Sequence, residues 1–271
     1  MSDYIYGIHP VEEVLCSRGR SVERIWIQRG AKNPRLQKII HAAKKNQIEL
    51  CFEEKSRMDE RVQAGHHQGV VALCSKKDTY SLNDLLNIPL REGEDPFFLI
   101  LDHVEDPGNL GAVIRSAAAA GVHGVIVQNR GTAPLGAVAF KRSAGALEKV
   151  PVARVTNLVR AMESLKNKGI WMIGACAQSR ECYMDMDFSG PIALVIGGER
   201  GLRRLVEETC DRMVSIPMKG GSKRLVQRKY SRLCDRMVSI PMKGGAESLN
   251  LSVAASLLLY EVVRKRRGKQ K

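Results

Sequence analysis

The stretch Pro96–Gly121, PFFLILDHVEDPGNLGAVIRSAAAAG, places an apolar run directly before a helical pattern. The run PFFLILD is too apolar for a half-exposed strand, so it predicts a central strand of a parallel sheet. Asp106-Pro107-Gly108 is typical of a turn, and Asn109 is suited to cap the helix that follows. One face of that helix is predicted to be buried, because apolar residues repeat at helical spacing: Leu110, Val113, Ile114 and Ala117.

Three more apolar runs follow at intervals that helical patterns fill: GVIVQ (124–128), GIWMIGAC (169–176) and PIALVIGG (191–198). This alternation predicts an α/β domain with a mostly parallel sheet over residues 96–271. No G-x-G-x-x-G follows any of these runs. A nicotinamide-dependent dehydrogenase is therefore disfavoured, because this sequence lacks the glycine-rich motif that binds the dinucleotide phosphates in such enzymes.

A smaller unit precedes this domain, over residues 1–77. Helical patterns at 7–17 and 36–47 alternate with strand patterns at 22–28 and 69–74. That order predicts a small α/β/α domain. Residues 78–95 lose apolar density and contain Asn, Pro and Gly, so we expect a linker or hinge there.

The composition points to a polyanionic partner. The formal net charge is +14, and the end Arg264–Lys271 carries six basic residues in eight. Such an excess favours nucleic acid as the partner, although solubility alone is the plainer explanation. The start of the chain lacks the pattern of a signal peptide, and no run of eighteen apolar residues exists, so we expect a soluble cytoplasmic protein without membrane contact. Seven scattered cysteines without C-x-x-C argue against a disulfide framework and a zinc site.

Two polar side chains stand where parallel strands are predicted to end. Arg115 borders the apolar stripe of its helix, and a guanidinium at such a place suits phosphate, although it could also be an ordinary edge arginine. Glu199 follows Gly197-Gly198 at the carboxyl end of a strand, the usual ligand side of an open α/β sheet. The glycines permit close approach of a ligand or of another backbone segment. A glycine turn with a solvated glutamate is the alternative.

The C-terminal part reads SIPMKGGAESLNLSVAASLLLYEVVRKR. A strand ends at its proline, and Ser248 and Asn250 precede a helix that is expected to begin near Leu251. Asn250 is a good candidate for the helix cap. The small residues Ala254, Ala255 and Ser256 permit a close contact between helices or between subunits.

Taken in order, N-L-G-A-V-I-R, G-G-E and I-P-M-x-G-x-x-x-S-L-N-x-S-V-A closely resemble the motifs of the SpoU family of RNA ribose 2′-O-methyltransferases. The resemblance is greatest to the branch that methylates a guanosine of 23S rRNA. The first domain, with YGIHPVEEVL and HQGVVAL, resembles that branch's ribosomal-protein-like RNA-binding domain.

The resemblance implies a C-terminal trefoil knot, a rare topology, and S-adenosylmethionine (AdoMet) as the cofactor, with no metal. It also implies a homodimer in which Arg115 of one subunit serves the other subunit's cofactor. Arg115 is cast as the base in the family, but arginine has a pKa above ~12 and no acceptor, so a phosphate clamp is the alternative. By position, the implied cofactor contacts are Gly197, Ile240 and Leu249. The implied functional polar residues are Asn109, Arg115, Glu199, Ser248 and Asn250.

This sequence departs from the family pattern twice. The second motif, G-x-E-G-x-G in relatives, is one residue short at Glu199-Arg200-Gly201. The segment CDRMVSIPMKGG occurs twice, as a first copy at Cys210–Gly221 and a second copy at Cys234–Gly245. We expect Met237–Met242 of the second copy to form the knot strand, because it runs directly into the cofactor loop; Ile216 replaces Ile240 if the first copy does so.

Three functions remain open at this stage. The first is AdoMet-dependent 2′-O-methylation of rRNA. The second is RNA binding without catalysis, with a cofactor pocket that the repeat and the shortened motif disrupt. The third is a tRNA-directed relative of the same family, which the N-terminal domain makes less favoured.

Overall fold

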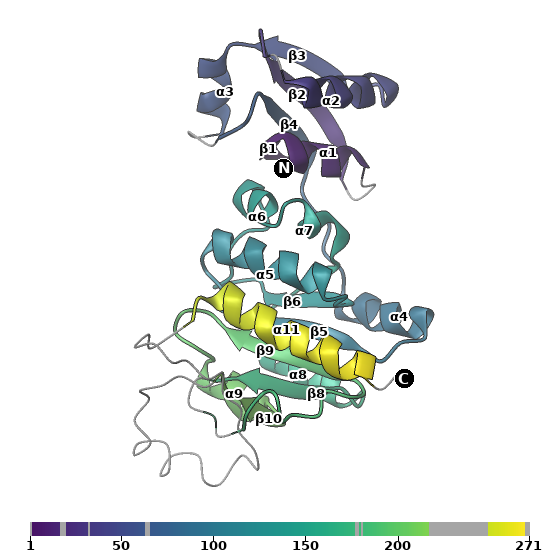
Figure 1. The fold of residues 1–271 in the computed structure, drawn as a ribbon, viewed down its shortest axis with the longest axis vertical. Coiled ribbons are helices and arrows are strands. Elements are labelled where there is room, and N and C mark those ends of the chain that lie inside the picture. Colours follow the sequence, from purple (N-terminus) through teal and green to yellow (C-terminus); the bar gives the residue numbers. More distant parts are fainter. Residues whose placement is uncertain are drawn as a thin grey trace. The chain divides into compact units, whose positions relative to one another are not determined.

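The computed structural model of the chain describes residues 2–16, 20–31, 33–62, 66–176, 179, 181–216 and 249–268. These residues fall into two compact units, and each unit draws on more than one stretch of the sequence (Figure 1). The first unit holds residues 1–78, 107–115 and 134–149, and the second holds 79–106, 116–133 and 150–271. The expected domains, residues 1–77 and 96–271, divide the chain in sequence order, whereas each compact unit combines separate segments. These expected boundaries therefore remain a proposal.

The first unit is built on a mixed four-stranded sheet in the order β1-β4-β2-β3. β4 runs antiparallel to β1 and β2, whereas β2 and β3 are parallel. Its strands are β1 (Ser2–Tyr6), β2 (Val22–Gln28), β3 (Glu49–Glu53) and β4 (Val70–Ser75). Its helices include α1 (Ile8–Cys16), α2 (Pro34–Lys45), α3 (Lys55–Arg61), α6 (Ala137–Arg142) and α7 (Ala146–Lys149).

Alternation along β2 explains why helices lie on both faces of this sheet. Trp26 clusters with Val71 and with Met58 of α3. Ile25 and Ile27, which alternate with Trp26, are also buried, and α1 and α2 contact β4 and β3 respectively. The prediction of a small α/β/α domain is confirmed.

A buried ion pair explains why residues 134–149 belong to the first unit. Arg20 Nε donates to Glu148 Oε1 at 2.6 Å, and both side chains are fully buried. Arg20 Nη2 also donates to the carbonyl oxygen of Leu135 at 3.3 Å. A buried charge is tolerated only where it is paired and hydrogen-bonded, so these contacts fix α7 against the N-terminal segment.

The second unit is built on a parallel sheet of six strands in the order β10-β8-β9-β5-β6-β7. Every neighbouring pair in it is parallel, which confirms the α/β prediction. The strands are β5 (Phe97–Asp102), β6 (Gly124–Gln128), β7 (Val152–Val155), β8 (Trp171–Ala175), β9 (Ile192–Gly197) and β10 (Arg212–Val214). The helices include α4 (Leu82–Glu92), α8 (Leu158–Lys166), α9 (Arg204–Thr209) and α11 (Leu251–Gly268), while α5 (Pro107–Ala119) contributes residues to both units.

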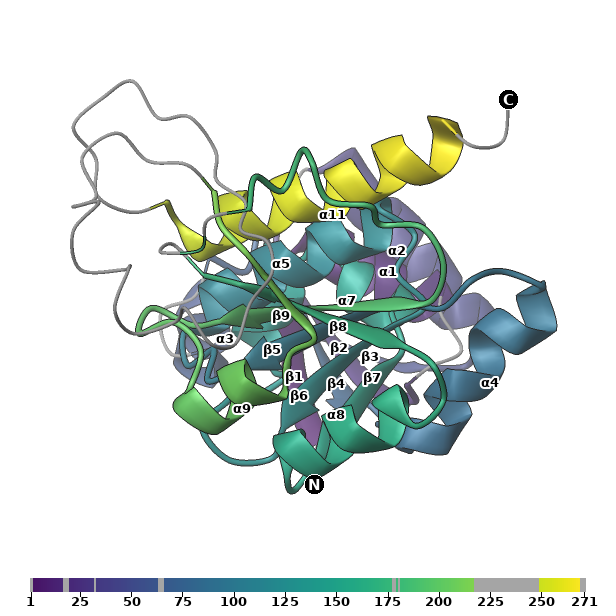
Figure 2. The same ribbon diagram turned by 90° about the horizontal axis from the view of Figure 1, so that it is seen from below.

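Helices cover both faces of this sheet, which is why β5 and β9 are buried along their whole length. Figure 2 shows α11 on one side of the sheet and α8 and α9 on the other. Phe98 and Val195 pack with Met162 of α8 and Val206 of α9 in one apolar cluster. On α11, the buried residues are Ala255, Leu258, Leu259, Glu261 and Val262.

The small residues of α11 make a contact between helices of this chain. Ser256 Oγ lies 2.7 Å from Ser116 Oγ of α5, and Ala255 beside it is fully buried. Small side chains allow helix backbones to approach closely, so the expectation of a tight helix contact is confirmed within one subunit.

Two local features differ from the simplest expectation. Residues 78–95, expected to be a linker or hinge, contain the helix α4 (Leu82–Glu92), with a capping box between Ser81 and Asp84 and a fully buried Leu85. Asn109 is not the cap of α5, because that helix already begins at Pro107. Proline is favoured in the first helical turn, where its missing N–H has no partner to lose.

The first copy of the repeat contributes a strand to the second sheet. Arg212–Val214 of that copy form β10 and pair with Ile173–Ala175 of β8. β8 has β9 on its other side, so the described strand at this edge comes from the first copy. The expectation that Met237–Met242 of the second copy forms the knot strand falls on residues outside the described part of the chain. The first copy begins directly after α9, and only its residues Cys210 and Asp211 separate α9 from β10. Such a short connection has a low entropic cost of closure.

Residues 217–248 lie outside the described part of the chain. They include the second copy, Met237–Met242, Ile240 and Ser248. The trefoil knot that the resemblance implies depends on the same segment and stays a prediction. Among the described helices, none has the length and apolar content needed to cross a membrane.

Candidate cofactor and active site

A tight glycine turn closes the carboxyl end of β9. The Gly201 amide donates to the Gly198 carbonyl at 2.9 Å, and Gly201 has a φ of +75°, which favours glycine. A Cβ on Gly197 would meet the backbone of Gly201, and one on Gly198 would meet the backbone of His103. The expected close approach is thus made by the chain's own backbone, and Glu199 projects from the turn as an exposed side chain.

Asp102, at the carboxyl end of β5, holds both ends of this turn. Its carbonyl accepts from the Gly198 amide at 2.8 Å. Its carboxylate accepts from the Arg203 amide at 2.9 Å and from Arg203 Nε at 2.8 Å. Arg203 Nη2 also donates to Gln128 Oε1 of β6 at 2.6 Å. This network fixes where the turn presents Glu199.

Sequence reasoning did not identify Asp102, Gln128 or Arg203. The sequence did contain a signal for Asp102, because this carboxylate ends the otherwise apolar run PFFLILD. In the structure Asp102 is fully buried. Buried carboxylates need partners, and an arginine soon after another strand end was a candidate partner. No pattern in the sequence paired the two.

Leu249 and Asn250 stand immediately before α11. Asn250 Oδ1 accepts from the Ser252 amide at 2.9 Å, and its carbonyl accepts from the amides of Val253 and Ala254 at 3.0 Å each. The prediction that Asn250 caps the last helix is confirmed. Its oxygen is engaged in that cap, so Asn250 acts first as a structural residue that sets the start of α11.

Asn109 and Arg115 lie on α5 in the first unit, whereas Gly197, Glu199, Leu249 and Asn250 lie in the second. Asn109 is half-buried in the first turn of α5, and Arg115 is exposed. Gly111 between them allows the close approach of α6, because a Cβ there would meet the Ala139 carbonyl. The structure thus brings Gly197 and Glu199 together on one turn, Leu249 and Asn250 together at one cap, and Asn109 and Arg115 together on one helix.

The residues at the carboxyl edge of the sheet fit AdoMet. The carboxyl ends of parallel strands meet at one edge, which is where open α/β sheets bind ligands. Gly197 ends β9 there, and Ile216 follows β10 at the same edge with 9% of its surface exposed. Ile216 belongs to the first copy and is the residue that the sequence offered in place of Ile240, which lies outside the described residues. An apolar side chain and a glycine backbone suit an adenine ring.

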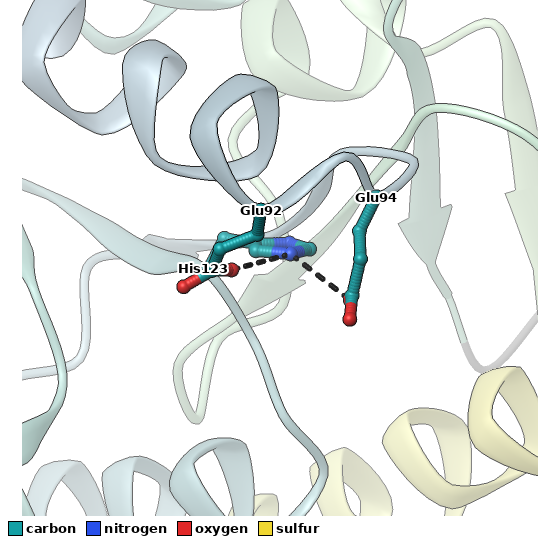
Figure 3. A group of neighbouring side chains, drawn as sticks. All are labelled: Glu92, Glu94 and His123. Atoms are coloured by element: carbon teal, nitrogen blue, oxygen red, sulfur yellow. Dashed lines mark ion pairs between the residues drawn. The ribbon is translucent and has the colours of Figure 1, made fainter.

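A cluster of Glu92, Glu94 and His123 has side chains close enough to hold a metal ion (Figure 3). His123 Nε2 lies 3.4 Å from a carboxylate oxygen of each glutamate. However, His123 Nδ1 accepts a hydrogen bond from the Phe97 amide at 3.0 Å, which puts the ring proton on Nε2. Metal-bound histidines instead donate from their second nitrogen, so this arrangement disfavours metal binding.

Solved structures with the same fold include SpoU methyltransferases. The SpoU methyltransferase AviRb from Streptomyces viridochromogenes, in complex with AdoMet, matches with a TM-score of 0.72 and 26% identity, over 98% of this chain and 91% of that one. Residues 96–225 match the model of the SpoU rRNA Methylase family, and residues 4–80 match that of RNA 2'-O ribose methyltransferase substrate binding. The chain belongs to the SpoU rRNA methylase family.

Two curated relatives span nearly the full length of the chain. RlmB of Escherichia coli K12, named a 23S rRNA (guanosine-2'-O-)-methyltransferase, is 38% identical over 267 residues, which cover 98% of this chain and 100% of RlmB. YacO of Bacillus subtilis, whose name places it among TrmH family tRNA/rRNA methyltransferases, is 40% identical over 265 residues, covering 97% of this chain and 96% of YacO.

Proposed function

We propose that this protein transfers a methyl group from AdoMet to the 2′-hydroxyl of a ribose in ribosomal RNA, with a guanosine of 23S rRNA as its target. The observation that carries the proposal is the full-length likeness to RlmB, which includes both the methylase and the substrate-binding part. The net charge of +14 suits the polyanionic substrate. Because ribosomal RNA is the substrate, the proposed reaction takes place in the cytoplasm.

The main task of the protein in this reaction is to align the reacting groups. When bound, AdoMet supplies an activated methyl group on a good leaving group. The chain must orient the ribose oxygen toward that methyl group and help to remove one proton. Recognition of the 2′-hydroxyl restricts the substrate to RNA, in a loop where the nucleotide is splayed out.

Glu199 and Arg115 have different roles in this proposal. The Asp102–Arg203 network holds the turn that carries Glu199, so its carboxylate is presented at the carboxyl edge beside Gly197. Arg115 is exposed on α5 and offers a rigid fork of donors. A guanidinium stays protonated near neutral pH, so Arg115 acts as a clamp on an RNA phosphate that positions the hydroxyl.

A homodimer is part of the proposal. Val253, Leu257 and Tyr260 lie at i, i+4 and i+7 on α11, and Val253 and Tyr260 are nearly half exposed, at 46% and 49%. Their spacing makes one apolar stripe on the outer side of the helix. A second copy that covers this stripe would bury it and would bring one subunit's residues to the other's site.

One feature favours the alternative, RNA binding without catalysis. The first copy of the repeat forms β10, which ends at Val214, and 34 residues, 215–248, separate this strand from the cap of α11 at Leu249 and Asn250. The family pattern places the cofactor loop directly after this strand. Equilibrium binding of AdoMet distinguishes the two functions, because only the enzyme needs the cofactor.

The test is transfer of label from methyl-labelled AdoMet to RNA. Undermodified 23S rRNA, a tRNA pool and a DNA of matched length are offered separately. The proposal expects label in 23S rRNA and none in DNA. Label in tRNA alone would support the tRNA-directed function, and tight rRNA binding without AdoMet binding would support the non-catalytic one.

A further inference from the structure

Helix α2 carries charge of a single sign. Its sequence, PRLQKIIHAAKK, contains four Lys or Arg residues and one histidine but no Asp or Glu. Helix α1 contains two glutamates and no Lys or Arg, and α3 contains both acids and bases. Among these three helices, α2 is the one that carries basic residues without acids.

The burial of α2 puts these cations on one surface. Leu36, Ile39 and Ala43 are buried against the sheet. At 3.6 residues per turn, Lys38, His41 and Lys45 lie on the opposite side of the helix, and Lys44 lies beside them. All four are exposed. We call the surface formed by Lys38, His41, Lys44 and Lys45 the α2 basic face.

The cations of this face are not neutralised within the described chain. No salt bridge with a described carboxylate involves Lys38, Lys44 or Lys45. Arg35, at the amino end of α2, is different: its Nη1 lies 2.9 Å from His9 Nε2, and His9 Nδ1 lies 3.6 Å from Glu12.

We propose that the α2 basic face binds the phosphate backbone of the RNA substrate. Lysines are point charges on flexible stems, which suit contact with phosphates and read no base sequence. Lys38 and Lys45 are seven residues apart, which is about 10 Å along the helix axis, so the face spans more than one phosphate. Its role is to position the RNA. This inference rests on the proposed function, since it takes rRNA as the substrate.

The test compares two double variants with equal loss of charge. Lys38→Gln/Lys45→Gln removes two cations from the α2 basic face. Arg160→Gln/Lys168→Gln removes two exposed cations from the second unit and is the matched control. Binding to a 23S rRNA fragment is measured at several salt concentrations, and circular dichroism checks that each variant is folded.

The α2 variant should bind on the order of tenfold more weakly at physiological salt. The slope of log K against log salt should become shallower by about 0.7 to 0.9 for each lost contact, that is by about 1.4 to 1.8. The control should keep the wild-type slope. Because Lys45 also lies in the last turn of α2 and favours the helix dipole, Lys38→Glu alone is a second test, and it should weaken binding as well.

Several outcomes would overturn the inference. A wild-type slope in both α2 variants would show that the face does not contact RNA, and an equal loss in the control would show that only total charge matters. In either case wild-type methyl transfer to rRNA would leave the proposed function intact. Absence of both rRNA binding and transfer in the wild-type protein would overturn the two proposals together.

Discussion

Asp102 and Arg203 lie 101 residues apart in the chain and form a two-point contact at the carboxyl edge of the second sheet. The carboxylate accepts one hydrogen bond from the Arg203 amide and one from its guanidinium, at 2.9 and 2.8 Å. Because the Asp102 carbonyl also binds Gly198, a single residue ties β5 to both ends of the turn that bears Glu199. The geometry of the turn that carries Glu199 therefore depends on this contact.

Asp102→Asn should weaken AdoMet binding about tenfold and lower the free energy of unfolding by about 1–3 kcal/mol. The amide keeps one acceptor oxygen but loses the charge that matches Arg203, and it leaves a buried polar group imperfectly paired. Equilibrium titration of AdoMet and urea denaturation measure the two effects.

Glu208→Gln is the control for this change. It removes the surface pair with Arg204, in which the nitrogen and oxygen atoms lie 3.3 Å apart, and it should cost less than about 0.5 kcal/mol. Cofactor affinity in Asp102→Asn equal to that of the control would show that Asp102 supports the fold alone and does not position the turn.

Arg115→Ala should lower the rate of methyl transfer by at least about a hundredfold and leave AdoMet binding nearly unchanged. A misplaced reacting group costs this much even when no contact with the cofactor is lost. Single-turnover transfer and cofactor titration separate the two quantities. Loss of both together would count against a role in orienting the RNA, and full recovery in Arg115→Lys would count against a bidentate contact.

Arg266→Ala should destabilise the second unit by about 2 kcal/mol. Arg266 donates to the carbonyl oxygens of Asp95, Pro96 and Gly190 at 2.9, 3.0 and 2.7 Å, and its guanidinium lies over the Phe97 ring. Burial lowers the pKa of Arg266. Three carbonyls would lose their donor, which thermal unfolding should show as a lower Tm.

This contact changes the expectation for the basic C-terminal end. The charge pattern of Arg264–Lys271 predicted an RNA-binding tail, but Arg266 binds carbonyl groups and Arg264 pairs with Glu261 at 2.6 Å. Removal of the whole end would therefore also remove the contacts of Arg266 and affect RNA binding indirectly. Arg267→Gln alone is the better probe, and it should make RNA binding less salt-dependent without a change in Tm.

Deletion of Ser222–Gly245 should preserve the fold and bind AdoMet at least as tightly as the full chain. The deletion removes the second copy and joins Gly221 to Ala246, so the first copy, which forms β10, runs directly into AESLN. Loss of loop length lowers the entropic cost of closing the segment before α11. Weaker cofactor binding in the deletion protein would show that the second copy contributes to the site.

The sequence was sufficient to predict β2, β4, β5, β6, β8 and β9, because each contains a run of apolar residues, whereas β1, β3 and β7 were not predicted. PFFLILD and PIALVIGG became β5 and β9 with every residue from Phe97 to Asp102 and from Ile192 to Gly197 buried. The cap at Asn250 was also predictable, since asparagine before a helical apolar pattern is a local signal.

Features that depend on distant contacts were not predictable. The helix at Leu82–Glu92 is an exception, because Leu82, Leu85 and Leu86 already repeat at helical spacing and pack in the core of the second unit. Its Asn, Pro and neighbouring Gly residues favoured the interpretation as a linker. The Asp102–Arg203 pair joins positions whose proximity follows from the strand order, which periodicity does not give. The two copies of CDRMVSIPMKGG are identical, so their local preference for a strand is equal. What distinguishes the first copy is its direct connection to α9.

The measurement that tests the central claim most directly is nucleoside mass analysis of 23S rRNA after reaction with the protein and AdoMet. The proposal predicts 2′-O-methylguanosine, with the added mass on the ribose fragment. A methyl group on a base, or no added methyl group under conditions where the protein binds both AdoMet and the RNA, would contradict it.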